Sequence, residues 1–393
     1  MYLNKLINLK DLEIIKIITG VRRCGKSTLL NTIFYRHLLE NGVDEKHVIR
    51  LNLEQLAYSE MDYKQLYANI SNQIIGSGRY YLFLDEIQEI DDYDKLVNVL
   101  MLEHDVDIYL TGSNSKLLSR EISTYLSGRF IEIPMLPLTF TEYAGAFSVT
   151  ADPKKLLMEY LKYEGFPFTV GLTEETKDMF FQGVYYSVLM KDVVERYSIR
   201  DINLLTNLVL EVFSSIGSLT SPNKLSNTLI SKGYKGTNVS IRNYLEYLTS
   251  SFIVYKCNRY SIKGKKYFEN SAKYYTVDLG LRNSILNYRQ VEISHLLENA
   301  IFLELLGKGY KVDVGDCDGT EVDFVCRKQG RIIYLQVAQT LIGTGKLEHE
   351  SVSLLRIQDN FEKYIITLDD VLFETLDNGI RVKNVVNFLR DDI

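Results

Sequence analysis

Residues 14–42 read IIKIITGVRRCGKSTLLNTIFYRHLLENG. The segment opens with a short run of isoleucines, which is typical of a strand buried on both faces of a parallel sheet. A polar loop follows at residues 20–27, and a stretch with helical periodicity then runs to Gly42, a residue type that commonly ends helices. The order strand, loop, helix predicts an α/β fold built on a parallel sheet.

The loop matches the pattern GxxxxGK[ST] at every fixed position. This spacing lets backbone N–H groups surround phosphate groups, because the glycines allow turns that a side chain would block. Lys26 would reach the β- and γ-phosphates of a nucleotide, and the Ser27 hydroxyl would bind Mg²⁺. The sequence therefore predicts a binding site for ATP with Mg²⁺. Its residues are Gly20, Val21, Arg22, Arg23, Cys24, Gly25, Lys26, Ser27 and Thr28.

A second apolar run, YYLFLDEIQEI at residues 80–90, leads into two acids, Asp85 and Glu86. At about 60 residues after a phosphate-binding loop, this pattern is typical of a Walker B strand. We expect Asp85 to hold Mg²⁺ through water, and Glu86 to act as the general base that polarises the attacking water. The alternative is a strand that simply ends in solvated acids.

Polar residues also end a third apolar run, VDIYLTGSN at residues 106–114. Ser113 or Asn114 is expected to contact the γ-phosphate or the attacking water, and Asn114 is assigned to the catalytic set. An arginine that neutralises the charge of the transition state is expected as well. Arg129, which precedes another apolar run, is preferred over Arg120, and the alternative for both is a surface arginine.

These segments, taken in order, carry a family resemblance. They are GVRRCGKST (20–28), LFLDEIQ (82–88), LTGSNSKLLS (110–119), LSGRFIEIPMLPLTFTEY (126–143) and EGFPF (164–168). They resemble the AAA-type ATPases widespread in bacteria and archaea, which are close to archaeal ATPases of the STAND class. The resemblance covers nearly the whole chain. It implies a parallel sheet with the strand before the loop at its centre, followed by a carboxy-terminal domain of unknown function.

Four parts are expected along the chain, at residues 1–145, 146–200, 201–290 and 291–393. The first is the P-loop ATPase domain. The second has apolar residues at three- and four-residue steps and is expected to be a helical lid or linker. The third predicts three helices and then a hairpin that turns at residues 263–265, which is the order of a winged helix.

The third part is basic, with twelve lysines and arginines against five acids, inside a chain whose net charge is −6. Such a block often marks an anionic partner. We therefore predict that residues 201–290 bind double-stranded DNA, with the third helix in the major groove and the hairpin on phosphate. The alternative is an adaptor that binds no nucleic acid and carries its charges on a solvated face.

The last part resembles the restriction-endonuclease-like fold, in which a helix glutamate, a strand aspartate and an E/Q-x-K pair gather around Mg²⁺. Glu298, Asp323 and Gln336 match this pattern, but Ala338 stands where the lysine belongs. Losing a cation that steadies the nucleophilic water or the developing charge removes transition-state stabilisation. We expect a small nuclease-like α/β domain with a vestigial site. Three other cations are candidates to replace the lysine: Arg327, Lys328 and Lys346.

Length and composition restrict the remaining classes. At 393 residues, with 46% hydrophobic and 24% charged residues, the chain is expected to be a globular protein of several domains. Its start shows no signal peptide, and no apolar run approaches the ~20 residues that span a bilayer. Four cysteines without CxxC spacing fit a reducing cytoplasm, without disulfides or a zinc site. A homo-oligomer is compatible with the sequence.

Three function classes are consistent with these residues. The preferred class is a Mg²⁺-dependent, ATP-hydrolysing switch whose carboxy-terminal half binds a partner. The alternative is an ATP-gated, metal-dependent DNA nuclease, which Ala338 disfavours. The third class is a small-molecule P-loop kinase. Asp85 and Glu86 argue against it, because such a pair suits the activation of water better than the positioning of an acceptor.

Overall fold

The structure, a computed structural model, describes residues 1–58, 60–115, 128–148, 150–163, 165–288, 292–370 and 374–391. The chain divides into two compact units. Unit 1 comprises Met1–Met135 with the short segment Ser250–Phe252, and unit 2 comprises Leu136–Thr249 with Ile253–Ile393. Each unit is built around its own sheet.

Unit 1 contains a five-stranded parallel sheet with the order β2-β3-β4-β1-β5. The strands are β1 (Ile15–Thr19), β2 (Val48–Asn52), β3 (Tyr80–Asp85), β4 (Val106–Gly112) and β5 (Phe130–Pro134). The helices are α1 (Tyr2–Leu9), α2 (Lys26–Thr28), α3 (Tyr35–Glu40), α4 (Tyr63–Ser71) and α5 (Tyr93–Glu103). The α/β class predicted from the sequence is confirmed. The strand before the loop is interior, between β4 and β5, although β4 is the middle strand.

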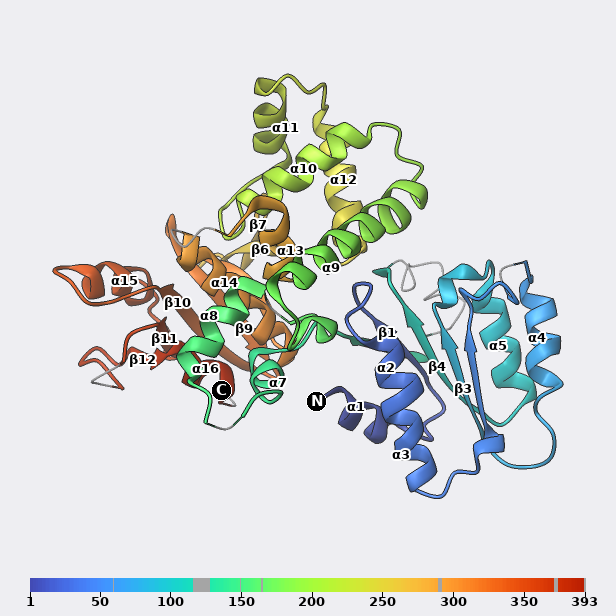
Figure 1. Cartoon of the computed structure of the whole chain (residues 1–393). Helices are drawn as coiled ribbons and strands as arrows, with labels where there is room; N and C mark the ends of the chain where they lie inside the picture. Colours follow the sequence, from blue (N-terminus) through green and yellow to red (C-terminus); the bar gives the residue numbers. More distant parts are fainter. Residues whose placement is uncertain are drawn as a thin grey trace. The chain divides into compact units, whose positions relative to one another are not determined.

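Helices cover both faces of this sheet. Figure 1 shows α1, α2 and α3 on one face and α4 and α5 on the other. A π-helical segment, Leu29–Phe34, joins α2 to α3, so that one continuous helix runs from the loop. Every residue of β1 and β3 is buried, as expected for strands covered on both faces. The sequence therefore dictates a rigid frame whose strand ends fix the positions of the loops.

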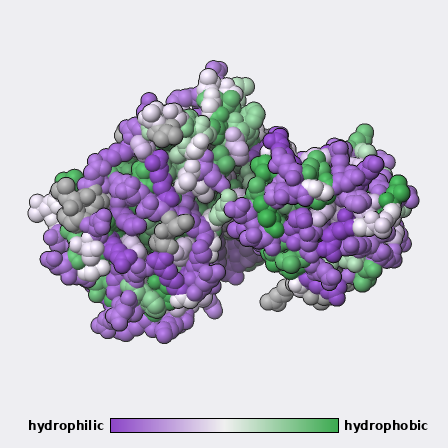
Figure 2. Space-filling view, turned by 90° about the horizontal axis from the view of Figure 1, so that it is seen from below, coloured by the Kyte–Doolittle hydropathy of each residue, from purple (hydrophilic) through white to green (hydrophobic). Residues whose placement is uncertain are grey.

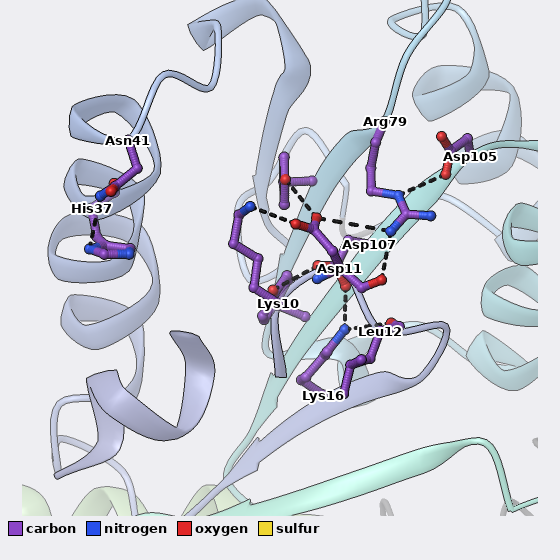
Figure 3. A network of polar contacts seen from close by, with 11 residues as sticks. Lys10, Asp11, Leu12, Lys16, His37, Asn41, Arg79, Asp105 and Asp107 are labelled. Atoms are coloured by element: carbon purple, nitrogen blue, oxygen red, sulfur yellow. Dashed lines mark hydrogen bonds and ion pairs between the residues drawn. The ribbon is translucent and has the colours of Figure 1, made fainter. Parts of the chain in front are cut away.

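A buried ion pair lies near the amino-terminal ends of β1 and β4 (Figure 3). Lys16 Nζ donates to Asp107 Oδ1 at 2.5 Å and to the Leu12 carbonyl at 2.8 Å. Asp107 Oδ2 also accepts from the backbone N–H of Asp11 at 2.9 Å and from the Tyr109 hydroxyl at 2.8 Å. This network connects the turn after α1 to two interior strands.

Unit 2 contains a seven-stranded mixed sheet with the order β12-β11-β10-β9-β8-β6-β7. The strands are β6 (Val254–Ser261), β7 (Lys266–Thr276), β8 (Lys311–Cys317), β9 (Thr320–Lys328), β10 (Arg331–Ala338), β11 (Glu362–Thr367) and β12 (Arg381–Asn384). The helices are α7 (Phe140–Ala144), α8 (Pro153–Tyr163), α9 (Glu174–Ser187), α10 (Ile202–Ser214), α11 (Pro222–Ser231), α12 (Asn238–Ser250), α13 (Leu279–Leu286), α14 (Ile293–Gly307), α15 (Lys346–Leu355) and α16 (Val385–Arg390).

The helix α14 is buried along nearly its whole length. It packs in one hydrophobic core with Phe324 of β9 and Leu335 of β10, while a second core joins Leu354 of α15 to Val325 and Tyr334. Successive residues of a strand point to opposite faces, so α14 and α15 cover the two faces of the sheet. A helix that is apolar all round needs such a covered position.

The helices predicted for residues 201–250 are present as α10, α11 and α12, which lie together in Figure 1. The Ser221 side chain caps α11, and Pro222 is at its first position. In the loop between α10 and α11, Thr220 exchanges backbone hydrogen bonds with Ala272 of β7, at 2.9 and 3.0 Å. The predicted hairpin is present as β6 and β7.

The structure differs from our expectation in the surroundings of this hairpin. β6 pairs in parallel with β8, from Arg259↔Val314 to Ser261↔Asp316, so the hairpin is the edge of the large sheet and not a separate projecting wing. The boundary predicted at residue 290 falls within unit 2, and unit 1 ends at Met135 where a boundary at 145 was predicted. The division of the chain into four domains stays a prediction. An alternating strand has the same pattern in a wing and in a sheet, so the sequence did not distinguish them.

The surface visible in Figure 2 is mostly hydrophilic, with hydrophobic residues in separate groups. None of the helices in the described ranges has the length and apolar character needed to cross a membrane. All four cysteines are buried free thiols.

Candidate functional site

The loop after β1 has a backbone that requires glycine at two positions. Gly20 has φ +155°, and a Cβ there would lie 2.2 Å from the carbonyl oxygen of Met135. Gly25 has φ +109°, in the left-handed region that other residues avoid. Arg23 also has a positive φ, of 68°. Positive φ values at such positions are typical of the backbone conformations that form cradle-like anion-binding loops.

Lys26 lies inside this cradle and is buried. Its ammonium donates to the carbonyl oxygens of Gly20 at 3.0 Å and Val21 at 3.2 Å. Its Nζ is also 3.6 Å from Glu86 Oε1. The sequence predicted Lys26 as the cation for phosphate, and the structure places it in the loop beside the predicted general base.

Asp85 and Glu86 lie at the carboxyl end of β3, and both are buried. The Thr111 hydroxyl donates to Asp85 Oδ1 and accepts from the backbone N–H of Glu86 at 2.9 Å. The side chain of Ser27 also hydrogen-bonds to Asp85. Burial raises the pKa of Asp85, and these hydrogen bonds act in the opposite direction.

Glu86 adopts a left-handed backbone conformation, with φ 55° and ψ 54°. For a residue other than glycine, such strain persists only where the surroundings enforce it, and it is frequent at functional sites. Gln88 Nε2 donates to Glu86 Oε2 at 2.5 Å and lies 3.4 Å from Ser113 Oγ. These contacts aim the carboxylate of Glu86 toward the end of β4.

Our sequence prediction missed Thr111 and Gln88. A polar residue at the end of the apolar strand 106–112 was a usable signal for Thr111, because the carboxyl ends of parallel strands meet at one edge of the sheet. Gln88 carried no comparable signal. Asn114 is buried at the same end of β4 as Ser113, in the position where a contact with phosphate was expected.

The two arginines of the loop differ in their contacts. Arg22 pairs with Glu54, at 2.9 Å between Nη1 and Oε1, whereas Arg23 is exposed. These observations assign a phosphate-binding role to neither arginine. Cys24 is buried, and this burial raises the pKa of its thiol.

The prediction for Arg129 is wrong for the site of its own chain. Arg129 precedes β5, and its carbonyl oxygen accepts from the N–H of Ile15 at the start of β1. Because β1 and β5 are parallel, Arg129 lies at the opposite edge of the sheet from the loop after Thr19. Five residues of strand separate the two edges by about 16 Å. Arg120, the other candidate, lies outside the described residues.

These residues fit ATP with Mg²⁺. The cradle has no room for a Cβ at Gly20, its lysine is bonded only to oxygen atoms that phosphate oxygens can replace, and a hydroxyl and a carboxylate from Ser27 and Asp85 meet beside it. Hydroxyl and carboxylate oxygens are the ligands that Mg²⁺ prefers.

A second polar cluster lies in unit 2 and contains the predicted vestigial residues. Lys273 of β7 is buried, and its Nζ lies 2.6 Å from Glu298 Oε1, 2.7 Å from Glu321 Oε1 and 3.4 Å from Asp323 Oδ1. The Tyr275 hydroxyl donates to Glu298 Oε1 at 2.5 Å. The structure thus brings Glu298 and Asp323 together, as the sequence predicted, around a cation that the sequence analysis did not name.

Gln336 joins this cluster through the backbone of β9. Its Oε1 accepts from the N–H of Asp323 at 3.4 Å and from the Ser353 hydroxyl at 3.1 Å. Ala338 is buried against α15, and its methyl side chain offers no polar group at this position. Of the three predicted substitutes for the lysine, Arg327 pairs with Asp313, Lys328 lies over the Tyr310 ring, and Lys346 lines the hollow beside the cluster.

The charges of this cluster depend on its burial. Burial raises the pKa of Glu298 to about 7, and Asp323 acts in the same direction against the opposing effect of Lys273. Burial acts to lower the pKa of Lys273, but Asp323, Glu298 and Glu321 outweigh it and raise the pKa above its usual value. Lys273 is therefore a charged ammonium.

The basic block of the sequence has acidic partners within unit 2. Four of its cations pair with acids from residues 292–393. The pairs are Arg259–Asp316, Lys263–Asp318, Lys273–Glu298 and Arg282–Glu292. A part of the charge asymmetry that suggested DNA is thus neutralised across the seven-stranded sheet.

Comparison with known proteins supports the reading of unit 1. A family described as an AAA domain matches residues 13–144, and a domain of unknown function matches residues 154–292. The Walker-type ATPase PABY2304 of Pyrococcus abyssi is similar in fold, with a TM-score of 0.52 and 15% identity over 72% of this chain and 94% of that chain. The prediction of an AAA-type P-loop ATPase is confirmed. The links to STAND proteins and restriction endonucleases stay predictions.

Two curated relatives match almost the whole chain. An uncharacterized protein of Haemophilus influenzae is 38% identical over 394 residues, which cover 99% of this chain and 97% of that protein. An uncharacterized protein of Methanocaldococcus jannaschii is 31% identical over 423 residues, which cover 98% of this chain and 90% of that protein. The chain therefore belongs to the family of these two proteins, a family of AAA-domain P-loop ATPases in which a domain of unknown function follows the ATPase domain.

Proposed function

We propose that the protein hydrolyses ATP with Mg²⁺ in unit 1 and that this reaction switches the binding of a partner by unit 2. The observation that supports it is the convergence of Lys26, Asp85 and Glu86 at one edge of the five-stranded sheet. A kinase needs a base placed for an acceptor substrate. Here the carboxylate of Glu86 is held beside the loop lysine by Gln88, an arrangement suited to a small nucleophile such as water.

The residues of the chain divide the work in the following way. Backbone N–H groups of the loop and the Lys26 ammonium bind the phosphates and stabilise the charge that develops on them. Mg²⁺, held by Ser27 and Asp85, supplies further charge neutralisation when bound. Glu86 orients water and accepts its proton, Gln88 holds the carboxylate of Glu86, and Thr111 accepts from its backbone N–H.

The substitution Glu86→Gln tests this assignment. The variant keeps the shape of the side chain and loses the base, so it should bind ATP as the wild type does and hydrolyse it at least about 100-fold more slowly. Binding is measured with a fluorescent ATP analogue and turnover by phosphate release. Glu89→Gln, an exposed glutamate three residues later, is the matched control and should hydrolyse ATP normally. Unchanged turnover in Glu86→Gln would place the base elsewhere and reopen the kinase class.

For unit 2, we propose a winged-helix element formed by α10, α11, α12, β6 and β7. The bridge between Thr220 and Ala272 supports it, because a loop before the second helix pairs with the hairpin. Six exposed cations of this element pair with no acid among the described residues and favour an anionic partner such as double-stranded DNA. They are Lys224, Lys235, Arg242, Lys256, Lys265 and Lys266.

DNA binding is tested with the full chain, because β6 also belongs to the large sheet. We expect weak binding of a duplex oligonucleotide whose affinity falls steeply with salt, and a smaller salt slope for Arg242→Glu with Lys256→Glu. Lys46→Glu, in unit 1, is the control. If the wild type, the double variant and Lys46→Glu bind DNA equally, the element does not bind DNA and an adaptor role remains.

The alternative function, an ATP-gated nuclease, is disfavoured because Ala338 carries no polar group. In a plasmid-nicking assay with Mg²⁺ or Mn²⁺, the wild type should leave the plasmid intact. Nicking by the wild type that disappears in Asp323→Ala would establish the nuclease in place of the inactive domain.

A further inference from the structure

We propose that the Lys273 ammonium is the resident cation of the Glu298, Glu321 and Asp323 cluster, in the place where the predicted nuclease-like site would hold a divalent metal. The cluster of the native protein is then closed to Mg²⁺ and Mn²⁺. Removing the ammonium should create a metal site that the wild type lacks.

Lys273 Nζ lies at the centre of the three acids. It lies within 3.4 Å of carboxylate oxygens from all three acids, which come from α14 and β9, while the lysine itself comes from β7. An ammonium has three N–H donors, and here each has a carboxylate within reach. The lysine side chain is 2% exposed, so water does not compete for these contacts.

Acceptor oxygens of the cluster already have donors from the protein. Glu298 Oε1 accepts from Lys273 and Tyr275, and Asp323 Oδ2 accepts from the N–H of Val337 at 2.9 Å. Gln336 Oε1 accepts from Ser353. A divalent cation needs about six oxygen ligands, so it would have to displace these donors.

The carboxylates of the native cluster are not arranged as metal ligands. Within the described ranges, no group of three or more His, Cys, Asp or Glu side chains is placed to hold a metal ion. The carboxylates are spread around the ammonium instead. The ammonium is the positive charge shared by the three acids, so removing it leaves buried carboxylates without a compensating cation.

The carboxylates of the cluster are accessible from a hollow at the surface of unit 2. Glu298, Asp323 and Gln336 line an open hollow of about 480 Å³, together with His295 and Lys346. Metal ions and water can therefore reach the carboxylates once the ammonium is gone. Lys346 lies on the side of the hollow formed by α15, and no ion pair between it and these acids occurs in the described part of the chain.

The experiment measures Mn²⁺ bound by nucleotide-free, full-length protein, from the signal of free Mn²⁺ in electron paramagnetic resonance. Lys273→Met keeps the length of the side chain and removes the charge. We expect it to bind one more Mn²⁺ than the wild type, at least about tenfold more tightly than any wild-type binding at this cluster. The extra ion should disappear in Lys273→Met with Asp323→Asn. Lys311→Met, at an exposed lysine of β8 in the same sheet, should bind Mn²⁺ as the wild type does.

Two results would overturn the proposal. One is a folded Lys273→Met protein that gains no Mn²⁺. The other is Mn²⁺ binding by the wild type that is lost in Asp323→Asn, which would show that metal and lysine share the cluster. The second result needs only the wild-type cluster with one neutralised acid, so it decides the question even where Lys273→Met fails to fold. Binding at the ATP site is the same in all these proteins and cancels in the differences.

Discussion

At the scale of single residues, a hydroxyl to which the sequence analysis gave no role connects the two acids of the candidate ATP site. Thr111 joins Asp85 to the backbone of Glu86, so it fixes the two acids relative to each other. Thr111→Val keeps the shape of the side chain, removes both hydrogen bonds and leaves the buried N–H of Glu86 without its acceptor. Such a loss costs about 1–3 kcal/mol.

We expect the hydrolysis rate of Thr111→Val to fall about tenfold, with ATP affinity changed much less, because Lys26 and the loop are untouched. Phosphate release and titration of a fluorescent nucleotide measure the two quantities. Thr32→Val, at an exposed threonine of the same unit, serves as the reference substitution. A Thr111→Val enzyme with wild-type turnover would show that the hydroxyl has no part in orienting Glu86.

Sequence reasoning at this scale succeeded where chemistry is local. Gly20, Lys26, Asp85 and Glu86 were predicted because each belongs to a short segment whose geometry follows from its own residues. Lys273 was missed because its partners lie 25 to 50 residues further along the chain, and nothing near Lys273 announces them. The only local indication was that Lys273 stands among mostly apolar residues at the end of an expected strand.

At the scale of elements, the direction of strands explains the wrong prediction for Arg129. An arginine at the start of a strand that is parallel to β1 is at the far edge from the loop. That relation was available from the predicted parallel sheet. The pairing of β6 with β8 was not, because parallel strands far apart in sequence carry no local mark of their neighbour.

The ion pair between β1 and β4 gives a prediction at this scale. Burial lowers the pKa of Lys16, and the contact with Asp107 acts against that effect. Asp107→Ala leaves a buried ammonium without its partner and should lower the free energy of unfolding by about 3–5 kcal/mol. Urea denaturation followed by circular dichroism measures this change.

The matched variant is Lys16→Met with Asp107→Asn, in which no charge is left buried and the amide oxygen still accepts from Asp11 or Tyr109. It should lose clearly less stability than Asp107→Ala alone. Equal losses in both proteins would mean that the hydrogen bonds of Asp107, and not its charge, hold the turn after α1.

At the scale of the whole molecule, the two units have separate hydrophobic cores around separate sheets. We therefore expect two transitions in differential scanning calorimetry. ATP analogue with Mg²⁺ at about 100 times the dissociation constant should add about 2.7 kcal/mol to the unit that binds it. Only one transition should move to higher temperature, and Lys26→Ala should abolish that shift. A single transition that moves as a whole would show that the units unfold together.

The parallel pairing of β6 with β8 also affects which parts of the chain can be exchanged by recombination. The match to the domain of unknown function ends at residue 292, before β8 begins at Lys311. A gene that carried only that stretch would encode β6 without β8, and the backbone N–H and C=O groups on that side of β6 would be unpaired. An unpaired strand edge can pair with other chains and lead to aggregation. Recombination would more readily exchange the part before Leu136, which holds the whole five-stranded sheet and all of unit 1 except Ser250–Phe252. The chain from Leu136 onward is then expected to be exchanged as one piece, because β6 and β8 belong to the same sheet.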